Sequence, residues 1–452
     1  MVRGNRVLRA DAPLALVGGL LAVALSVRLA VAWFLPPPAD FAYRSEPGWI
    51  AINLVEGRGY TFDFYGTRPE NPLRAFAPPL HPWLLAVSLL APDPPRALGV
   101  LQAALGALTV WLVYRLAVGL VGGRAAVMVG WGAALYPAHV LCTSQPISAV
   151  LHACCLAAVL LTSWELSRQP TLRRGIVVGV LVGLMALNRP HILAFIPFLW
   201  LWFRYGVGLD GNILVRPLAG LAAAAAVVVL PWAVYNGQVV GRPLPVPSNG
   251  GVTFWNGNNP FTTGSGHDVF ADRLAEYLGT TRDVQLPDVY EHPEPYPFPA
   301  EVTSRLGTLS ELELDRAFYQ AGLDYIRQQP ADWLRLEVRK LQSFWLFRPN
   351  LGSNPLYRSG WTPLYRVQYL LLLGLALAGL ALTARHWRRY GLLLGLYGLY
   401  TAIHLVFNVL TRYRWEIELT LLILAAPAVD AGWRWAGGRL RPVWRRWAGA
   451  GS

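Results

Sequence analysis

Long apolar runs, each bounded by polar or basic residues, form the main pattern of this sequence. The first run extends from Leu14 to Leu35 and follows arginines at positions 3, 6 and 9. An apolar helix of about 20 residues crosses a hydrocarbon core of roughly 30 Å, and basic residues favour the cytoplasmic side. The N-terminus is therefore expected in the cytoplasm, and Asp40 outside. Because no small-residue cleavage pattern precedes the Pro36–Pro38 turn, we expect the run to remain as a signal anchor.

Nine further apolar runs continue this alternation. Arginines follow alternate runs, for example Arg173 and Arg174, which is typical of cytoplasmic loops. A shorter piece, Leu80 to Leu90, is too short to cross the membrane and is expected to form an interfacial or re-entrant helix. The pattern predicts an all-α polytopic membrane protein with about 10 (8–13) transmembrane helices and both termini in the cytoplasm. The nine runs cover residues 98–120, 125–138, 148–166, 175–187, 192–203, 218–234, 365–382, 392–407 and 417–433.

Three parts follow from this alternation. Residues 1–235 form an N-terminal transmembrane core, which includes a first outer loop at residues 37–97 with interfacial helices. Residues 236–361 form a larger, more polar segment on the outer face. Residues 362–452 form C-terminal transmembrane helices and a basic cytoplasmic tail.

Helical patterns recur inside the outer-face segment. Ser310 and Glu313 have the spacing of a capping box, which predicts the start of a helix. A second amphipathic helix follows Pro330. We expect this helix to lie at the membrane interface. Its apolar stripe consists of Leu334, Val338, Leu341 and Trp345.

Composition agrees with the membrane class and excludes other classes. Of 452 residues, 54% are hydrophobic and only 14% are charged, which is outside the range of soluble domains. The net charge of +13 comes from arginines spread between the apolar runs, so they are interpreted as topology signals and not as a nucleic-acid surface. Cys142, Cys154 and Cys155 lack the spacing of a metal site or of a disulfide framework, and are expected to be inert.

Acidic and basic residues meet on the predicted outer face. The first outer loop carries Asp40 and Glu46 close to the end of the first run, and arginines 189, 412 and 414 lie in other outer turns. A carboxylate can deprotonate a hydroxyl, and a guanidinium matches the geometry of phosphate oxygens. Each residue also has a simpler interpretation: the acids as solvated loop residues, and the arginines as anchors near lipid headgroups. No carboxylate pair at metal-ligand spacing is evident, and no metal or other cofactor is predicted.

Two phrases in the first loop resemble a known family. Glu46-x-Gly48-x-Ile50-Ala51-x-x-Leu54-x-x-Gly57-x-Gly59-Tyr60 and Pro78-Pro79-Leu80-His81-Pro82-Trp83-Leu84-Leu85-Ala86 are similar to phrases of the GT-C glycosyltransferases that use polyprenyl-phosphate-linked sugars, in particular the bacterial relatives of protein mannosyltransferases and aminoarabinose transferases. His81 replaces the usual tyrosine. Further landmarks resemble the family in the same order: Tyr136-Pro137, Asn188-Arg189-Pro190, Pro231-Trp232, Ser248-Asn249-Gly250-Gly251, Gly257-Asn258-Asn259-Pro260, Pro330, Lys340 and Arg412-Tyr413-Arg414.

The resemblance implies a sugar transfer on the outer face of the cell membrane. A polyprenyl-phosphate sugar would be the donor, and a glycan, lipid or protein hydroxyl of the cell envelope the acceptor, with inversion at the anomeric carbon. Glu46 is the favoured base and Asp40 the second choice, although Glu46 also suits a plain helix start. Donor-phosphate binding is implied for Arg189, Arg412, Arg414 and, more weakly, Lys340. The implied cavity lining comprises Tyr60, His81 and Asn258, and His81 also fits a packed turn.

Two other hypotheses are open, and the first follows from a departure from the family. Relatives often carry an acid at the start of the fourth run, where this chain has Ser148-Ala149, so the chain would be either active without that acid or a catalytically inactive relative. The second hypothesis is a transporter or flippase of a lipid-linked intermediate, which predicts charged residues within the spans. Apart from Arg28 and Arg115, the ionisable residues lie at the ends of the runs, which favours the transferase.

Overall fold

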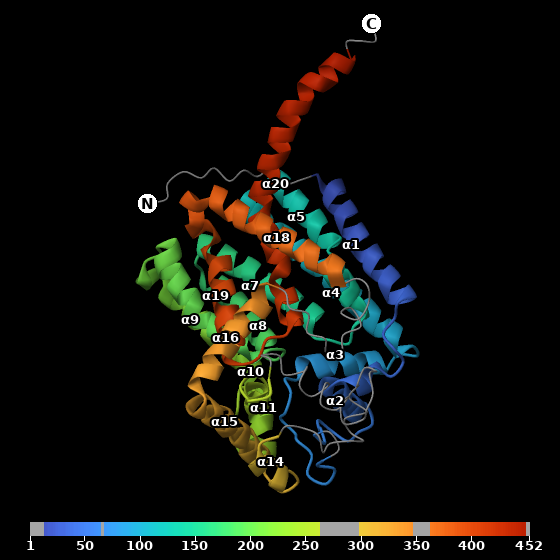
Figure 1. Cartoon of the computed structure of the whole chain (residues 1–452), viewed down its shortest axis with the longest axis vertical. Coiled ribbons are helices and arrows are strands. Elements are labelled where there is room, and N and C mark those ends of the chain that lie inside the picture. The colour runs from blue at the N-terminus through green and yellow to red at the C-terminus, as the bar shows by residue number, and fades with distance from the viewer. Residues whose placement is uncertain (1–12, 65–66, 263–297, 347–361, 449–452) are drawn as a thin grey trace.

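The described part of the chain is a helical, multi-pass membrane protein (Figure 1). The computed structural model describes residues 13–64, 67–262, 298–346 and 362–448. Within these ranges no β-strand forms, and the one extended pairing is an isolated bridge between Phe62 and Leu73. The predicted all-α class is therefore confirmed. Arginines 3, 6 and 9 and the boundary at residue 361 lie outside the described residues.

The first half of the chain alternates long helices with short ones. Local signals explain several starts: the Asp93 side chain accepts a hydrogen bond from the Arg96 N–H at 3.1 Å, and Pro94 occupies the first turn of its helix, where no N–H is needed. The elements are α1 (Leu14–Phe34), η1 (Phe41–Arg44), α2 (Glu46–Val55), α3 (Leu80–Leu89), α4 (Pro94–Val121), α5 (Gly123–Ala134), α6 (Pro137–Leu141), η2 (Cys142–Ser144), α7 (Ala149–Arg168), α8 (Leu172–Ala186), η3 (Pro190–Ala194), α9 (Phe195–Leu201), η4 (Trp202–Val207) and α10 (Gly211–Val240).

The second half begins with short helices and returns to long ones. The predicted capping box is present, because Ser310 Oγ accepts the Glu313 N–H while the Glu313 carboxylate accepts the Ser310 N–H at 2.8 Å. The elements are α11 (Gly250–Gly257), α14 (Ala300–Arg305), α15 (Glu311–Gln328), α16 (Pro330–Trp345), α18 (Thr362–Leu382), η5 (Ala384–Tyr390), α19 (Gly391–Val406) and α20 (Thr411–Ala448).

Fewer helices qualify as spans than the apolar runs suggest. Five described helices are long and apolar enough to cross a membrane, or six if the pair α5 and α6–η2, bent by 44°, counts as one span. The number of about ten is therefore not confirmed. Two physical reasons account for the difference: α8 and α19 have 15 and 16 residues, and α20 carries ionisable residues along its length.

The helices are arranged with a clear polarity (Figure 1). The start of α1 and the long end of α20 lie at one end of the bundle, whereas α2, α3, α11, α14 and α15 gather at the other. The first described helix therefore begins, and the last one ends, at the same end of the bundle. The side of the membrane on which the two termini lie stays a prediction. We call the end that carries α2, α3 and α15 the loop end.

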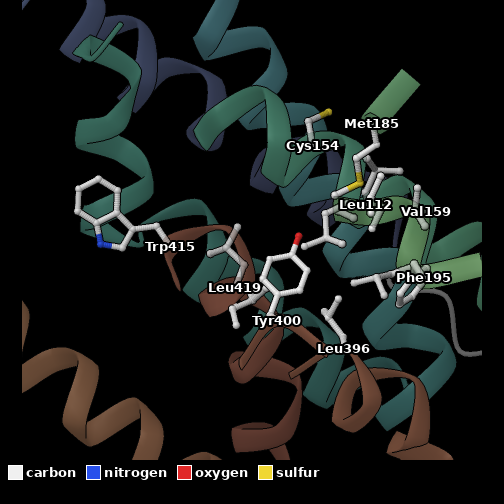
Figure 2. Close-up of a cluster of buried hydrophobic side chains, with 14 of the residues drawn as sticks. Leu112, Cys154, Val159, Met185, Phe195, Leu396, Tyr400, Trp415 and Leu419 are labelled. Carbon is white, nitrogen blue, oxygen red and sulfur yellow. The ribbon is translucent and has the colours of Figure 1, made fainter. Parts of the chain in front are cut away.

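Apolar side chains from distant helices meet in the centre of the bundle (Figure 2). Leu112, Cys154 and Met185 come from α4, α7 and α8, and face Tyr400 on α19 and Leu419 on α20. The C-terminal helices pack against the N-terminal core in this way because protein interiors are close-packed and leave few voids between interdigitated side chains. This packing positions the start of α20 beside the turn after α8.

The first loop is attached to the outer-face helices by polar contacts. Arg68 donates to the carbonyl oxygens of Leu306 at 2.5 Å and Leu309 at 2.6 Å. The Glu311 carboxylate accepts the N–H groups of Arg74 at 2.7 Å and Ala75 at 2.9 Å. These contacts hold two segments about 240 positions apart in the sequence in one unit. Whether the chain divides into the three predicted parts stays a prediction.

Candidate functional site

The turn after α8 presents Arg189 at the loop end of the bundle. Arg189 precedes Pro190 and is extended, with φ −148° and ψ 103°, as a residue before proline prefers. Its N–H donates to the Met185 carbonyl at 2.7 Å, and the neighbouring Leu187 carbonyl accepts the Leu80 N–H at 2.9 Å. The second contact attaches the start of α3, and with it the first loop, to this turn.

The Arg189 guanidinium is held on one edge and open on the other. Nη2 lies 2.7 Å from Oε1 of Glu416 and 3.2 Å from the Ser148 Oγ, to which it donates. The guanidinium also lies over the Tyr413 ring, 4.6 Å from its centroid. Within the described ranges Nε and Nη1 have no protein acceptor, and 15% of the side chain is exposed. The result is a fixed cation with free donors, which suits an anion.

Glu416 lies behind Arg189 and is fully buried. It stands near the start of α20, and its Oε2 is 3.2 Å from Nε2 of His152. The same His152 nitrogen is 2.6 Å from the Tyr400 hydroxyl. We call Arg189, Glu416, Ser148, His152 and Tyr413 the Arg189 cluster. The sequence analysis missed Glu416, although an acidic residue at the edge of a predicted span was a signal that could have identified it.

Two more histidines leave polar atoms without partners beside this cluster. The ring centroids of His191 and His404 are 5.8 Å apart, and His404 stacks on Tyr413 at 4.7 Å. Nε2 of each of the two histidines is buried without a hydrogen bond. Buried polar atoms of this kind are usually satisfied by water or a ligand, so the region suits a polar occupant.

His81 connects the first loop to the same region. Its Nε2 lies 3.4 Å from the Pro146 carbonyl, and its Nδ1 is buried without a partner. Burial lowers the pKa of His81 to about 4, and the positive charges of Arg189 and Arg412 lower it further. His81 is therefore neutral at physiological pH. Arg412, half-buried in the first turn of α20, lies 5.8 Å from the centroid of the Tyr413 ring, which Arg189 also contacts.

Arg414 has a structural role in this conformation. It is fully buried, and its Nε donates to Oε1 of Glu418 at 2.7 Å while Nη1 donates to the Phe344 carbonyl at 2.6 Å. Glu418 also accepts from Tyr136 and Tyr365, each at 2.6 Å. Arg414 and Glu418 are both buried inside the bundle, at the beginning of the predicted run 417–433.

Lys340 is likewise buried, although a lone lysine on an amphipathic helix usually faces solvent or lipid phosphate. Its Nζ donates to Asn258 Oδ1 at 3.1 Å, Glu337 Oε1 at 2.7 Å and the Leu405 carbonyl at 2.8 Å. All three ammonium protons are used, and burial lowers the pKa of Lys340. Asn258 donates in turn to the carbonyls of Phe254 and Val406, each at 2.9 Å. This group ties α11, α16 and α19 together.

The two candidate bases lie in the short helices of the first loop. Asp40 is exposed and precedes η1, and Glu46 is half-buried in the first turn of α2. Helix α2 begins at Ser45, whose hydroxyl accepts the Gly48 N–H at 3.2 Å. Tyr60 is buried, donates to the Ala77 carbonyl at 2.8 Å and packs on Trp232 with centroids 5.1 Å apart. In this conformation Tyr60 stabilises the loop from inside.

Among the described side chains, no three His, Cys, Asp or Glu residues are grouped as a metal ion would require.

Comparisons with known proteins find similarity in part of the sequence and in the whole fold. The model of the family described as dolichyl-phosphate-mannose-protein mannosyltransferase matches residues 77–235, a range that contains His81, Ser148 and Arg189. A search of curated protein sequences finds no match.

Among solved structures, the chain is similar to the oligosaccharyltransferase of Archaeoglobus fulgidus. The form tethered to an acceptor peptide gives a TM-score of 0.53 at 14% identity, over 92% of this chain and 49% of that one. The form in complex with an inhibitory peptide and a dolichol-phosphate gives 0.51 at 15% identity, over 97% and 52%. ArnT from Cupriavidus metallidurans, bound to undecaprenyl phosphate, matches at 0.43 and 15% identity, over 95% and 80%, and that score supports no argument. The chain spans about half the length of the oligosaccharyltransferase.

Proposed function

We propose that this chain, whose fold is that of the GT-C glycosyltransferases, is a membrane enzyme that transfers a sugar from a polyprenyl-phosphate-linked donor to a hydroxyl group of a cell-envelope acceptor. The loop end of the bundle would be the outer face of the cell membrane, as the arginine distribution indicates. The acceptor would be a glycan, a lipid or a protein.

The observation that carries this proposal is the half-open guanidinium of Arg189. One edge is held by Glu416 and Ser148, the face rests on Tyr413, and Nε and Nη1 remain available at the loop end. A fixed fork of this kind binds phosphate oxygens with two parallel hydrogen bonds. Arg189 also lies inside the range that matches the mannosyltransferase family model. Arg412 supplies a second positive charge nearby.

The phosphate-binding role is assigned here to two of the four candidate cations. Arg189 and Arg412 have exposed surface at the loop end, whereas Arg414 and Lys340 are fully buried with their donors engaged. In this conformation Arg414 and Lys340 have a structural role. A donor phosphate would reach Arg414 or Lys340 only after those contacts broke.

The reaction would proceed as a single inverting displacement. A first-loop carboxylate, Glu46 by preference and Asp40 otherwise, takes the proton of the acceptor hydroxyl. The oxygen attacks the anomeric carbon, and the bond from that carbon to the phosphate oxygen breaks. Polyprenyl phosphate leaves with the bonding electrons, and Arg189 and Arg412 stabilise its growing negative charge.

The test replaces each candidate base in the full-length protein. Turnover of a panel of polyprenyl-phosphate sugars should fall about 100-fold or more in Glu46→Gln, because general-base catalysis contributes on the order of 10²–10⁴. If Asp40 is the base, the loss moves to Asp40→Asn. Glu70→Gln changes an exposed acid of the same loop and should leave turnover unchanged. Wild-type turnover in both Glu46→Gln and Asp40→Asn would sink the proposal.

A transporter or flippase is the second candidate, because two arginines and two glutamates are buried among the helices of the bundle: Arg28, Arg414, Glu416 and Glu418. Intramembrane charges often mark a transport path. The turnover assay separates the two functions. A transferase breaks the bond between the sugar and the phosphate, whereas a transporter would move the lipid-linked sugar across a vesicle membrane with that bond intact.

A further inference from the structure

Glu416 is a buried carboxylate that the proposed reaction does not use. We infer that it is a positioning residue: it fixes the Arg189 guanidinium so that Nε and Nη1 meet the phosphate of a lipid-linked donor. The inference rests on the proposed function, and it extends that function from the residue that touches the ligand to the one that orients it.

The contact geometry separates the two edges of the guanidinium. Glu416 lies 2.7 Å from Nη2, but neither carboxylate oxygen meets the geometry of a hydrogen bond. The Nη2 hydrogen bond goes to Ser148 instead, at 3.2 Å. The attraction between Glu416 and Arg189 is therefore mainly between charges, whereas Ser148 and Tyr413 set the direction and the plane. Together they leave one orientation for the open edge.

Burial makes this arrangement specific to Glu416. Its side chain is 0% exposed, while that of Arg189 is 15% exposed. A buried carboxylate is costly unless a cation stays beside it, so Glu416 restrains a long, flexible side chain that would otherwise reach for solvent. A pre-oriented side chain loses less conformational entropy when it binds. Affinity for a phosphate should therefore depend on a residue that never touches it.

The charge of Glu416, considered alone, predicts the opposite effect on phosphate binding. An ionised Glu416 would lie one guanidinium away from the proposed phosphate, so through-space repulsion would weaken binding. Removing the charge would then tighten binding. These two effects have opposite signs, and a binding measurement distinguishes them.

The test uses the full-length protein in detergent, with undecaprenyl phosphate as the probe and inorganic phosphate in a parallel titration. We expect Glu416→Gln to weaken the binding of undecaprenyl phosphate about tenfold, in line with couplings between contacting residues, and Glu416→Asp to restore part of it. Inorganic phosphate should show the same order of variants at lower affinity. Unchanged or tighter binding in Glu416→Gln would overturn the inference.

A double-mutant cycle excludes a merely structural role. If Glu416 acts through Arg189, Arg189→Gln combined with Glu416→Gln should bind no more weakly than Arg189→Gln alone. Additive losses would contradict the inference. Asp430→Asn is the matched control, because it removes another acid of α20 that is paired with an arginine, Arg434, and should bind like wild type.

The failure of the proposed function gives a different result. If wild-type protein binds no undecaprenyl phosphate at all, the donor class is wrong, and Glu416 then orients no donor phosphate. If wild-type protein binds it and Glu416→Gln binds equally well, the donor class stands and the positioning role falls.

Discussion

Arg28 shows how a charge inside a span is stabilised by partners that no sequence pattern indicates. Its Nη1 donates to the Ala134 carbonyl at 2.9 Å and to Ala24 at 3.0 Å, and Nη2 donates to Ala133 at 3.3 Å. Ala133 and Ala134 end α5, whose last carbonyls have no helical partner and attract a cation. The sequence identified Arg28 as unusual, but two of its three acceptors lie more than 100 positions away. Its role is therefore structural.

Asp315 predicts a pH dependence outside the membrane. Burial raises the pKa of Asp315 from 3.8 to about 6, although the Gly251 N–H, 2.6 Å away, opposes the shift. The folded state then holds its proton more tightly than the unfolded state does. The stabilisation is complete below about pH 4 and is lost as the pH rises through about 6. Relative to the thermal midpoint of Asp315→Asn, that of wild type should decrease when the pH is raised from 4 to 7.

The control for this prediction lies on the same helix. Asp324 is 43% exposed, and Asp324→Asn is the control variant because it removes another acid of α15. A wild-type profile that runs parallel to that of Asp315→Asn would show that Asp315 does not titrate as the structure indicates.

The spacing of apolar residues predicted the helices of the outer-face segment, but it did not predict which side of α16 packs against the protein. The predicted apolar stripe of α16 is largely exposed: Leu334 is 59% exposed, Val338 55% and Leu341 43%. The opposite side, with Leu336 and Lys340, is buried. This orientation agrees with a helix at the membrane interface, where lipid covers the apolar stripe. Burial of Lys340 depends on Asn258, 82 positions away, and no local pattern shows that contact.

Glycines on α8 allow a close contact between α8 and α10. Gly175, Gly179 and Gly183 recur every four residues and face α10, and a Cβ at Gly179 would lie well inside 3.0 Å of the Leu221 carbonyl. Small residues at this spacing let two helices approach in a membrane. We expect Gly179→Ala to lower stability by about 1–3 kcal/mol, because overpacking forces the helices apart. The thermal midpoint in detergent measures this loss.

The matched substitution for Gly179→Ala is Gly18→Ala in α1. A Cβ at Gly18 would meet nothing within 4 Å, so the gain in helix propensity should leave stability equal or slightly higher. Equal losses in the two variants would mean that the α8–α10 contact does not limit stability. The four-residue glycine spacing was visible in the sequence, and it was a missed signal for this contact.

At the scale of the whole molecule, the alternation of apolar runs predicted the class but not the assembly of the site. Apolar periodicity is local, so the helical membrane class followed from it. The Arg189 cluster combines α7, α20 and the turn after α8. The family phrases singled out Arg189, yet Glu416 and His152 entered only through packing. Long-range pairing of this kind is a property of the folded bundle.

The central claim is that Arg189 binds the phosphate of a lipid-linked sugar at the loop end of the bundle. A cryo-electron microscopy map of the full chain with undecaprenyl phosphate tests it most directly. The account predicts phosphate density within hydrogen-bond distance of the Arg189 guanidinium, on the edge that carries Nε and Nη1, with Glu416 still behind it. Phosphate density at another place in the protein, with Arg189 unoccupied, would contradict it.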